Sequence, residues 1–158
     1  MSTQVVDHSA LKVNQAGIIV TVLVAFFGSW AFYRPLLVLI PLLAIVLLLG
    51  TFAPQLALFK QLYFKVLKPS GIVKPRPVQD RPEPHNFAQG LGGVFLAVSS
   101  VLLLPLPVSG QVAVVEGGLG LAIALLVAAL AFVNLAFGYC LGCQIYFQLG
   151  KRGLIQAS

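Results

Sequence analysis

Long apolar runs alternate with short polar stretches along this chain, and each run approaches the length of a membrane-spanning helix. Four runs stand out, at about residues 16–32, 36–53, 87–104 and 119–149. A helix needs about 20 mostly apolar residues to cross the hydrocarbon core of a bilayer. The last run is longer than that, so its end is expected to bend, tilt or emerge from the membrane. The pattern predicts an all-α membrane protein with four transmembrane helices.

The connections between the runs predict two helical hairpins. Tyr33-Arg34-Pro35 is short enough to force the second run to return antiparallel to the first. Pro41 lies inside the second run, where a neighbouring helix can cover the freed carbonyl, so a kink without a break is expected. The connection from Leu104 to Gly118 holds one charge, Glu116, which is expected in solvent.

Two further segments are predicted to lie outside the hydrocarbon core of the membrane. Residues 54–68 begin with Pro54, which suits the first turn of a helix. Their lysines fall away from an apolar face made of Leu56, Phe59, Leu62, Tyr63, Val66 and Leu67. This pattern predicts an amphipathic helix lying along the lipid headgroups. Residues 69–86 contain five prolines and five charged residues, which predicts an extended polar loop.

A faint internal repeat relates residues 13–68 to residues 87–150. VNQAGIIV, residues 13–20, resembles FAQGLGGV, residues 87–94, and LGTFAPQLALFK, residues 49–60, resembles FGYCLGCQIYFQ, residues 137–148. Chance similarity between apolar segments is the alternative. The repeat predicts that each hairpin is followed by an interfacial helix or helix extension on the cytoplasmic side, within a single domain of residues 1–158.

Composition and charge support the membrane interpretation. Apolar residues make up 59% of the chain and charged residues 9%, and the mean hydropathy is +0.98. Soluble domains carry roughly 25% charged residues. With a cytoplasmic N-terminus, nine of the ten basic residues lie on the cytoplasmic side and Arg34 alone lies opposite. The positive-inside rule therefore predicts cytoplasmic N- and C-termini in a bacterial inner membrane. Because the basic residues flank apolar segments, they indicate lipid headgroups as the partner and exclude nucleic acid.

Cys140 and Cys143 are the only cysteines, spaced C-x-x-C at the predicted cytoplasmic end of the last span. A purely structural disulfide is disfavoured in the reducing cytosol. Helical residues three apart have Cβ atoms about 5–6 Å apart, whereas a disulfide needs about 3.5–4.5 Å. Bonding therefore needs a local distortion, which Gly142 can supply.

The local helix geometry decides between two interpretations of this pair. A kink at Gly142 would place Cys143 in the first turn of a new helix, where the helix dipole favours a thiolate. In an unbroken helix both cysteines would lie near a C-terminal end, where they would be two small packed hydrophobes. A thiol-redox or sulfur-carrying pair and a packing pair both stay open.

A metal or cofactor site is not predicted. Structural zinc uses four ligands and catalytic zinc three. His8 and His85, the only histidines, are expected in loops on the side of the cysteines, but their spacing does not demand a shared site. No predicted span contains an internal charged residue or histidine, which argues against an ion-coupled transporter.

Asn134, Gly138 and Gly142 recur every four residues and form one stripe on the expected last helix. Small residues in such a stripe let a second helix approach closely, and a buried amide can bond across to it. The stripe points roughly away from the cysteines. It is therefore interpreted as a packing face for a partner helix.

The motif N-x-x-x-G-x-C-L-G-C-x-x-Y resembles that of a bacterial integral-membrane family known as domain of unknown function 4395. VDHSALKVNQ near the start and NFAQGLG before the third span share the resemblance, which covers nearly the whole chain. The motif maps onto Asn134, Gly138, Cys140, Leu141, Gly142, Cys143 and Tyr146. The resemblance implies a small four-span protein whose relatives are sometimes encoded near thioredoxin-like or sulfurtransferase proteins, and it implies no established activity.

The leading hypothesis is a membrane thiol-redox or sulfur-relay component, in which Cys140 and Cys143 exchange electrons or sulfur with a cytoplasmic thioredoxin-like or sulfurtransferase protein. The second is a non-catalytic accessory subunit of a larger membrane complex, and the third is a small-molecule permease. Whether the protein is an enzyme is left open by the sequence. Asn134, Gly138, Gly142 and Tyr146 are assigned to packing.

Overall fold

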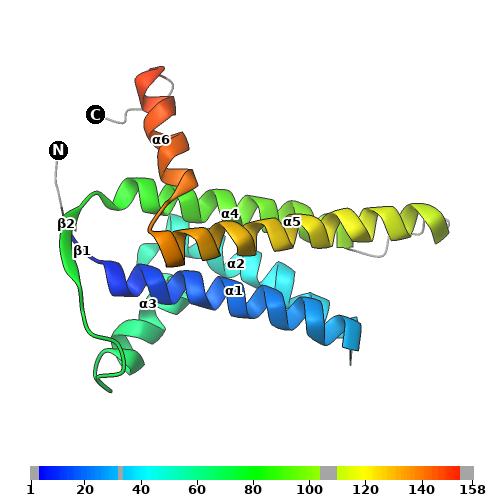
Figure 1. The fold of residues 1–158 in the computed structure, drawn as a ribbon, viewed down its shortest axis with the longest axis horizontal. Coiled ribbons are helices and arrows are strands. Elements are labelled where there is room, and N and C mark those ends of the chain that lie inside the picture. Colours follow the sequence, from blue (N-terminus) through cyan, green and yellow to red (C-terminus); the bar gives the residue numbers. More distant parts are fainter. Residues whose placement is uncertain (1–3, 32–33, 104–109, 154–158) are drawn as a thin grey trace.

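Four long helices lie side by side, and a shorter helix projects from one end of the bundle (Figure 1). The structure, a computed structural model, describes residues 4–31, 34–103 and 110–153. The bundle consists of α1 (His8–Ala31), α2 (Leu39–Phe52), α4 (Pro82–Leu103) and α5 (Gly110–Phe137). The projecting helix is α6 (Leu141–Lys151), and the short α3 (Leu58–Leu62) lies at the same end of the bundle. The predicted all-α class is confirmed.

Three helices in the described residues are long and apolar enough to cross a bilayer, whereas four were expected. They are His8–Trp30, Pro82–Leu103 and Gly118–Phe137, and the fourth apolar helix, Leu36–Phe52, is shorter. A 3₁₀ segment, Arg34–Val38, precedes α2. Pro41 then falls in the first turn of α2, where its missing N–H costs no hydrogen bond. The predicted kink at Pro41 is therefore replaced by a helix start.

The core of the bundle is built from small and branched side chains. α2 packs on α4, α4 on α5, and α5 on α1. The buried cluster includes Val22, Ile40, Leu47, Leu96 and Ala128. Two buried polar groups are satisfied within the bundle: Ser99 Oγ donates to the carbonyl of Gly120 at 2.6 Å, and Gln89 Nε2 donates to the carbonyl of Leu47 at 3.1 Å.

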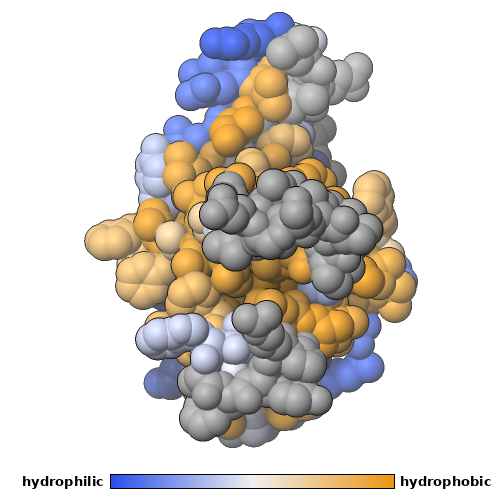
Figure 2. Space-filling model, turned by 90° about the vertical axis from the view of Figure 1, so that its right-hand side faces the viewer, coloured by the Kyte–Doolittle hydropathy of each residue, from blue (hydrophilic) through white to orange (hydrophobic). Residues whose placement is uncertain are grey.

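The outer surface of the bundle is apolar. Viewed toward the end opposite to α6, hydrophobic residues cover the middle of the molecule and hydrophilic residues gather at its upper and lower margins (Figure 2). Phe27, Ile45, Val98, Leu126 and Phe132 are all about half exposed. Exposed side chains of this size on four neighbouring helices need lipid as their surroundings. Together with the long apolar helices, this surface indicates insertion into a membrane.

The polar loop predicted over residues 69–86 is partly ordered into regular elements. β1 (Gln4–Asp7) pairs antiparallel with β2 (Pro77–Asp80), with Gln4 opposite Asp80 and Asp7 opposite Pro77. α4 then begins at Pro82 and not near Phe87. Prolines at 82 and 84 are compatible with this start, because the first N–H groups of a helix have no partner within it.

The predicted helix over residues 54–68 is broken into three short pieces. A 3₁₀ turn, Pro54–Leu56, leads into α3, and a π-helical turn, Tyr63–Leu67, follows it. Tyr63 is fully buried, whereas Leu56, Leu62 and Val66 are about half exposed, so the predicted apolar face divides between protein and surface. Exposed apolar residues beside lysines are still compatible with a position of this segment at the lipid–water boundary.

The fourth predicted span differs from the structure at both ends. α5 begins at Gly110, inside the expected connection from Leu104 to Gly118, and it ends at Phe137. Glu116, which was expected in a solvated loop, belongs to this helix, and its side chain lies outside the described part of the structure. The expected bend at the other end takes the form of a complete break between α5 and α6.

Candidate functional site

The break between α5 and α6 is produced by Gly138. Its φ angle of +69° lies in the left-handed region that favours glycine. Its N–H donates to the carbonyl of Asn134 at 3.0 Å, which closes α5 with a single C-terminal capping bond. The chain therefore turns at Gly138, which differs from both alternatives left open by the sequence, a kink at Gly142 and an unbroken helix. The stripe of Asn134, Gly138 and Gly142 is consequently divided between two helices.

Cys140 is the N-cap residue of α6, and it forms a disulfide with Cys143 in the first turn. The backbone of Cys140 is extended, with φ −93° and ψ 99°, and the two Cα atoms lie 5.2 Å apart. The distortion needed for bonding thus comes from the non-helical Cys140. The backbone N–H of Cys143 also donates to Cys140 Sγ at 3.2 Å.

The two sulfur-bearing residues differ in exposure. Cys143 is buried, with 8% of its surface exposed, whereas Cys140 is only partly buried. Cys140 Sγ also receives the N–H of Cys143 at the positive end of the α6 dipole, an arrangement that stabilises a thiolate once the disulfide is reduced. Cys140 is therefore the more exposed residue of the pair, and its sulfur is the better stabilised thiolate.

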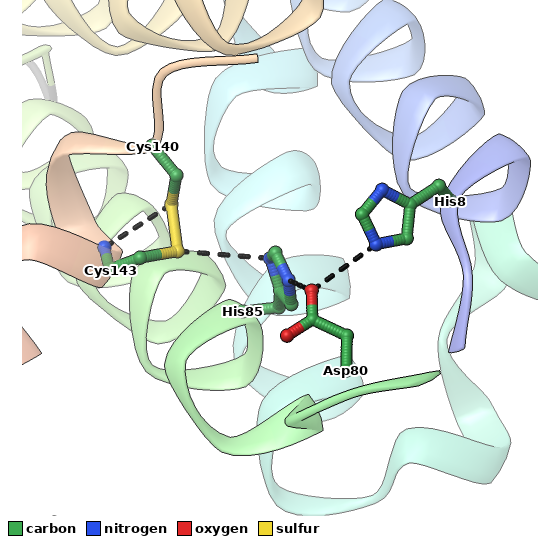
Figure 3. Close-up of a disulfide and its surroundings, with 5 residues drawn as sticks. All are labelled: His8, Asp80, His85, Cys140 and Cys143. Carbon is green, nitrogen blue, oxygen red and sulfur yellow. Dashed lines mark hydrogen bonds and ion pairs between the residues drawn. A yellow bond between two sulfur atoms is a disulfide. The ribbon is translucent and has the colours of Figure 1, made fainter. Parts of the chain in front are cut away.

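A row of three polar side chains extends from the disulfide across the end of the bundle (Figure 3). His85 Nδ1 lies 3.7 Å from Cys143 Sγ. On the other side of the same ring, His85 Nε2 lies 3.1 Å from Asp80 Oδ2, and His8 Nε2 lies 3.2 Å from that same oxygen. His85 belongs to the first turns of α4, His8 opens α1, and Asp80 ends β2. The expectation that both histidines lie in loops was wrong.

Asp80 determines which ring nitrogen of each imidazole carries a hydrogen. Partial burial alone would raise the pKa of Asp80, but hydrogen bonds from His85, the backbone N–H of Arg81 and His8 hold it below its usual value. Because an ionised carboxylate only accepts hydrogen bonds, each Nε2 atom carries its hydrogen. A neutral His85 then presents the lone pair of Nδ1 toward Cys143.

A second carboxylate holds the β-ribbon against the helices. Asp7 Oδ1 accepts the backbone N–H groups of Ser9 and Arg76, both at 3.0 Å, and Asp7 Oδ2 accepts the hydroxyl of Tyr63 at 2.9 Å. Burial opposes ionisation here too, yet these bonds keep the pKa of Asp7 below its usual value. The network secures β1 and thereby the position of His8, the next residue.

α6 is held against α4 by a close helix contact. A Cβ added at Gly142 would lie 2.5 Å from the Cβ and 2.7 Å from the Cα of Ala88, so this position has no room for a side chain. The ring of Tyr146 packs on that of Phe87, with their centroids 5.5 Å apart. Both contacts place the first turn of α6 beside His85.

Two small cavities share Cys140 as a lining residue. One, of about 100 Å³, is lined by His8, His85, Asn14, Asn134 and Cys140 among others. The other, of about 80 Å³, is mostly apolar and also touches Asn134, Cys140 and Gly142. Asn134 and Gly138 thus lie on the same side as the cysteines, whereas the sequence had placed their stripe away from them.

The structure brings together residues that the sequence did not connect. Asp80 was not singled out, and His85 was assigned no role, although both histidines were noted on the same side as the cysteines. The available signal was the cluster of acidic residues and histidine in D-R-P-E-P-H, residues 80–85, directly before an apolar helix. The sequence does not show that this segment lies near the cysteine pair, because that proximity depends on tertiary packing.

This arrangement supports two kinds of chemistry. A disulfide at a helix N-terminus beside a carboxylate-oriented imidazole has the parts needed for thiol–disulfide exchange. His85, Cys140 and Cys143 also place three potential metal-ligating atoms within 4.8 Å of one another, and His8, Asp80 and His85 form a second such group. Both groups share the imidazole of His85.

Comparison with known proteins gives a family assignment. No curated protein and no solved structure matches the chain. A family model does match, over residues 6–151, and its span includes every residue of the site. The chain therefore belongs to the family described as "Domain of unknown function (DUF4395)".

Proposed function

We propose that this protein is a membrane thiol–disulfide exchange component, with Cys140 and Cys143 as its redox pair. The observation that carries the proposal is the Cys140–Cys143 disulfide at the start of α6, in contact with the Asp80–His85 pair. Two packed hydrophobic cysteines need neither a helix N-terminus nor an oriented imidazole. Their presence favours a reactive pair over simple packing.

The two cysteines have different roles in this proposal. A thiolate of a dithiol substrate attacks Sγ of Cys140, the more exposed residue, and the Cys140–Cys143 bond breaks with its electron pair leaving on Cys143. The second thiolate of the substrate then attacks the mixed disulfide and releases Cys140. Two electrons and two protons thereby pass from the substrate dithiol to the cysteine pair. A disulfide substrate reoxidises the pair by the same steps in reverse.

His85 acts on the buried sulfur. In the oxidising direction the Nδ1 lone pair of His85 removes the proton of the Cys143 thiol. In the reducing direction Nδ1 first takes up a proton that the substrate dithiol releases, and it delivers that proton to Cys143 as this sulfur leaves as a thiolate. Asp80 keeps the hydrogen on Nε2 and holds the ring in its orientation. A carboxylate hydrogen-bonded to a catalytic imidazole commonly has this role. Positioned proton transfer of this kind contributes about 100- to 10,000-fold in rate.

The same sulfur atoms suit a sulfur relay. A persulfide carried on Cys140 would lose its outer sulfur to an acceptor thiolate, leaving the Cys140 thiolate behind. Cys140 is only partly buried, which supports access by either a thioredoxin-like or a sulfurtransferase partner. Dithiol exchange and sulfur relay differ in one measurable product. Only the sulfur relay yields a protein that is heavier by one sulfur atom.

We further propose that the site faces the cytoplasm of a bacterial inner membrane. The first and last described elements, β1 and α6, lie at the same end of the bundle as α3 (Figure 1). That end carries most of the basic residues: Lys12, Lys60, Lys65, Lys68, Lys74, Arg76, Arg81, Lys151 and Arg152. The positive-inside rule then assigns this end to the cytoplasm.

The repeat of residues 13–68 and 87–150 is also retained as a proposal. A two-fold relation would exchange α1 with α4 and α2 with α5, so that α1–α5 and α4–α2 become equivalent contacts. Both contacts are among the main helix pairs of the bundle. α3 follows α2 and packs on α1, just as α6 follows α5 and packs on α4.

The test is redox-controlled thiol labelling in sealed membranes. After mild reduction, a membrane-impermeant maleimide should modify Cys140 faster than Cys143, and only when applied from the cytoplasmic side. Purified protein should also equilibrate its disulfide with a thioredoxin-like dithiol. If neither cysteine reacts and Cys140→Ser/Cys143→Ser changes no redox or sulfur phenotype, the protein is better explained as an accessory subunit of a membrane complex.

A further inference from the structure

We propose that, once the disulfide is reduced, Cys140, Cys143 and His85 form a binding site for a thiophilic d¹⁰ cation, Zn²⁺ or Cu⁺. The inference goes beyond electron exchange, and it rests on the proposed function only in requiring a reducible disulfide. The three ligand groups come from two helices that are far apart in the chain, α4 and α6. Thiolate and imidazole are the donors that these cations prefer.

The distances suit a small coordination sphere. The candidate ligand atoms of the three residues all lie within 4.8 Å of one another, and His85 Nδ1 is 3.7 Å from Cys143 Sγ. Bonds of about 2.3 Å to sulfur and about 2.0–2.1 Å to nitrogen separate tetrahedral ligands by roughly 3.5–3.8 Å. The imidazole and the Cys143 sulfur already have this separation. Reduction lets the two sulfur atoms move apart to a similar distance.

The groups behind the ligands are those that metal sites use. Asp80 Oδ2 accepts the hydrogen of His85 Nε2, which orients the ring and leaves Nδ1 as its donor atom. A carboxylate behind a histidine ligand is the usual second partner in zinc sites. The N–H of Cys143 donates to Cys140 Sγ, which stabilises that sulfur as an anion.

The cavity beside the pair provides access and room for an additional ligand. Cys140 and His85 both line the cavity of about 100 Å³, and so does Asn14. Asn14 is 4% exposed, and its side chain makes no hydrogen bond to any described residue. Its amide is therefore free to hold a water molecule or a ligand bound to the metal. Three protein ligands with an open position are typical of reactive zinc sites.

Binding and oxidation exclude each other. A dithiol reductant first transfers two electrons to the disulfide and yields two thiols. The cation then replaces both thiol protons: one Zn²⁺ enters as two protons leave with no change in net charge, whereas one Cu⁺ in the same exchange leaves the site with one more negative charge. Because the metal-bound sulfurs cannot form a disulfide, the cation would hold the pair in its reduced form. The site thereby connects metal availability to the redox state of the protein.

The experiment uses the full chain in lipid nanodiscs, reduced with a phosphine and freed of metal. Co²⁺, which gives thiolate-to-metal charge-transfer absorption, is titrated as a spectroscopic substitute for Zn²⁺, and a parallel anaerobic arm uses Cu⁺ with a competing chelator. One equivalent per reduced chain and none per oxidised chain are expected. Binding in one arm alone identifies the cation, and binding in neither arm overturns the inference.

Variants separate ligands from neighbours. Cys140→Ser and Cys143→Ser should lose the charge-transfer band, and His85→Gln should lower the affinity while retaining sulfur ligation. His8→Gln is the matched control, because His8 touches the same Asp80 oxygen but lies outside the ligand set. Asp80→Asn should weaken binding about 10- to 100-fold. Equal binding by His85→Gln and wild type would contradict the assigned site.

The result is separable from the proposed function. Exchange with a dithiol but no metal binding would overturn this inference and leave the redox proposal intact. Metal binding without dithiol exchange would support this inference and overturn the redox proposal. A disulfide that resists both the dithiol and the phosphine in the folded protein would overturn both.

Discussion

The Nδ1 atom of His85 lies 3.7 Å from the sulfur of Cys143, although 58 positions separate the two residues in the chain. The opposite nitrogen of the same ring donates to Asp80, whose carboxylate also receives His8. One sulfur of the disulfide therefore ends a polar row that ties α1, β2 and α4 to the start of α6. Changes at His85 should therefore affect the cysteines directly, whereas changes at His8 reach them only through Asp80.

Single cysteine variants should distinguish the two sulfurs. Cys143→Ser leaves the partly buried Cys140 without its resolving partner, so Cys140 should accumulate as a stable mixed disulfide with its substrate. Cys140→Ser leaves only the buried Cys143 and should trap little. Non-reducing electrophoresis followed by mass spectrometry measures both products. Equal trapping by the two variants would contradict the assigned order of attack.

His85→Gln should slow the resolution of mixed disulfides by about 100-fold or more, because the proton on Cys143 loses its carrier. His8→Gln should have a much smaller effect, since His8 contacts Asp80 but not the sulfur. Stopped-flow measurement of dithiol exchange in nanodiscs gives the rates. A purely structural His85 would alter thermal stability while leaving the pH dependence of the rate unchanged.

Much of the bundle follows from residue chemistry alone. Apolar length and the scarcity of charge predict helices in a membrane, and α1 and α4 contain the described residues of their predicted spans, 16–31 and 87–103. The helix start at Pro82 was missed because proline suits both a loop and a first helical turn. The β-ribbon was missed because two four-residue strands, Gln4–Asp7 and Pro77–Asp80, pair only through the tertiary fold.

The sequence predicted the cysteine pair of the site but not the groups around it. The unique C-x-x-C pair identified Cys140 and Cys143, and a helix start next to them was correctly considered. The actual break at Gly138 depends on a capping bond that was not predicted. The approach of His85 depends on the close contact of α6 with α4, and no local pattern in the sequence specifies that contact.

Acidification should weaken the fold through Asp80. The native pKa of Asp80 lies below the ordinary value of 3.8, so its stabilising effect is fully present above about pH 3.8. That effect is lost as the pH falls through the lowered native pKa. Asp80→Asn should therefore flatten part of the acid branch of a plot of melting temperature against pH.

The matched control for this change is Glu83→Gln, an exposed acid in the first turn of α4. It should leave the acid branch close to that of wild type. Asp7, whose pKa is also lowered, should account for acid sensitivity that remains in Asp80→Asn. Identical acid branches for Asp80→Asn and wild type would contradict the assigned role of the carboxylate.

Gly142→Ala should displace α6 from α4. The added methyl group would meet the Cβ and Cα of Ala88, and overpacking of this kind typically costs about 1–3 kcal/mol. Thermal unfolding in detergent measures the loss. Gly118→Ala is the control, because a Cβ there meets no atom within 4 Å. Equal stabilities of the two variants would contradict the close contact.

Gly138→Ala should test whether the helix break creates the redox pair. At a φ of +69° an alanine costs about 1–2 kcal/mol, which favours continuing α5 through the cysteines. In a continuous helix the two Cβ atoms would be about 5–6 Å apart, so disulfide formation should slow markedly. Gly138→Asn should retain more of it, because asparagine tolerates the left-handed conformation. Oxidation rates followed by maleimide trapping provide the comparison, and unchanged oxidation in Gly138→Ala would show that the break is not what brings the sulfurs together.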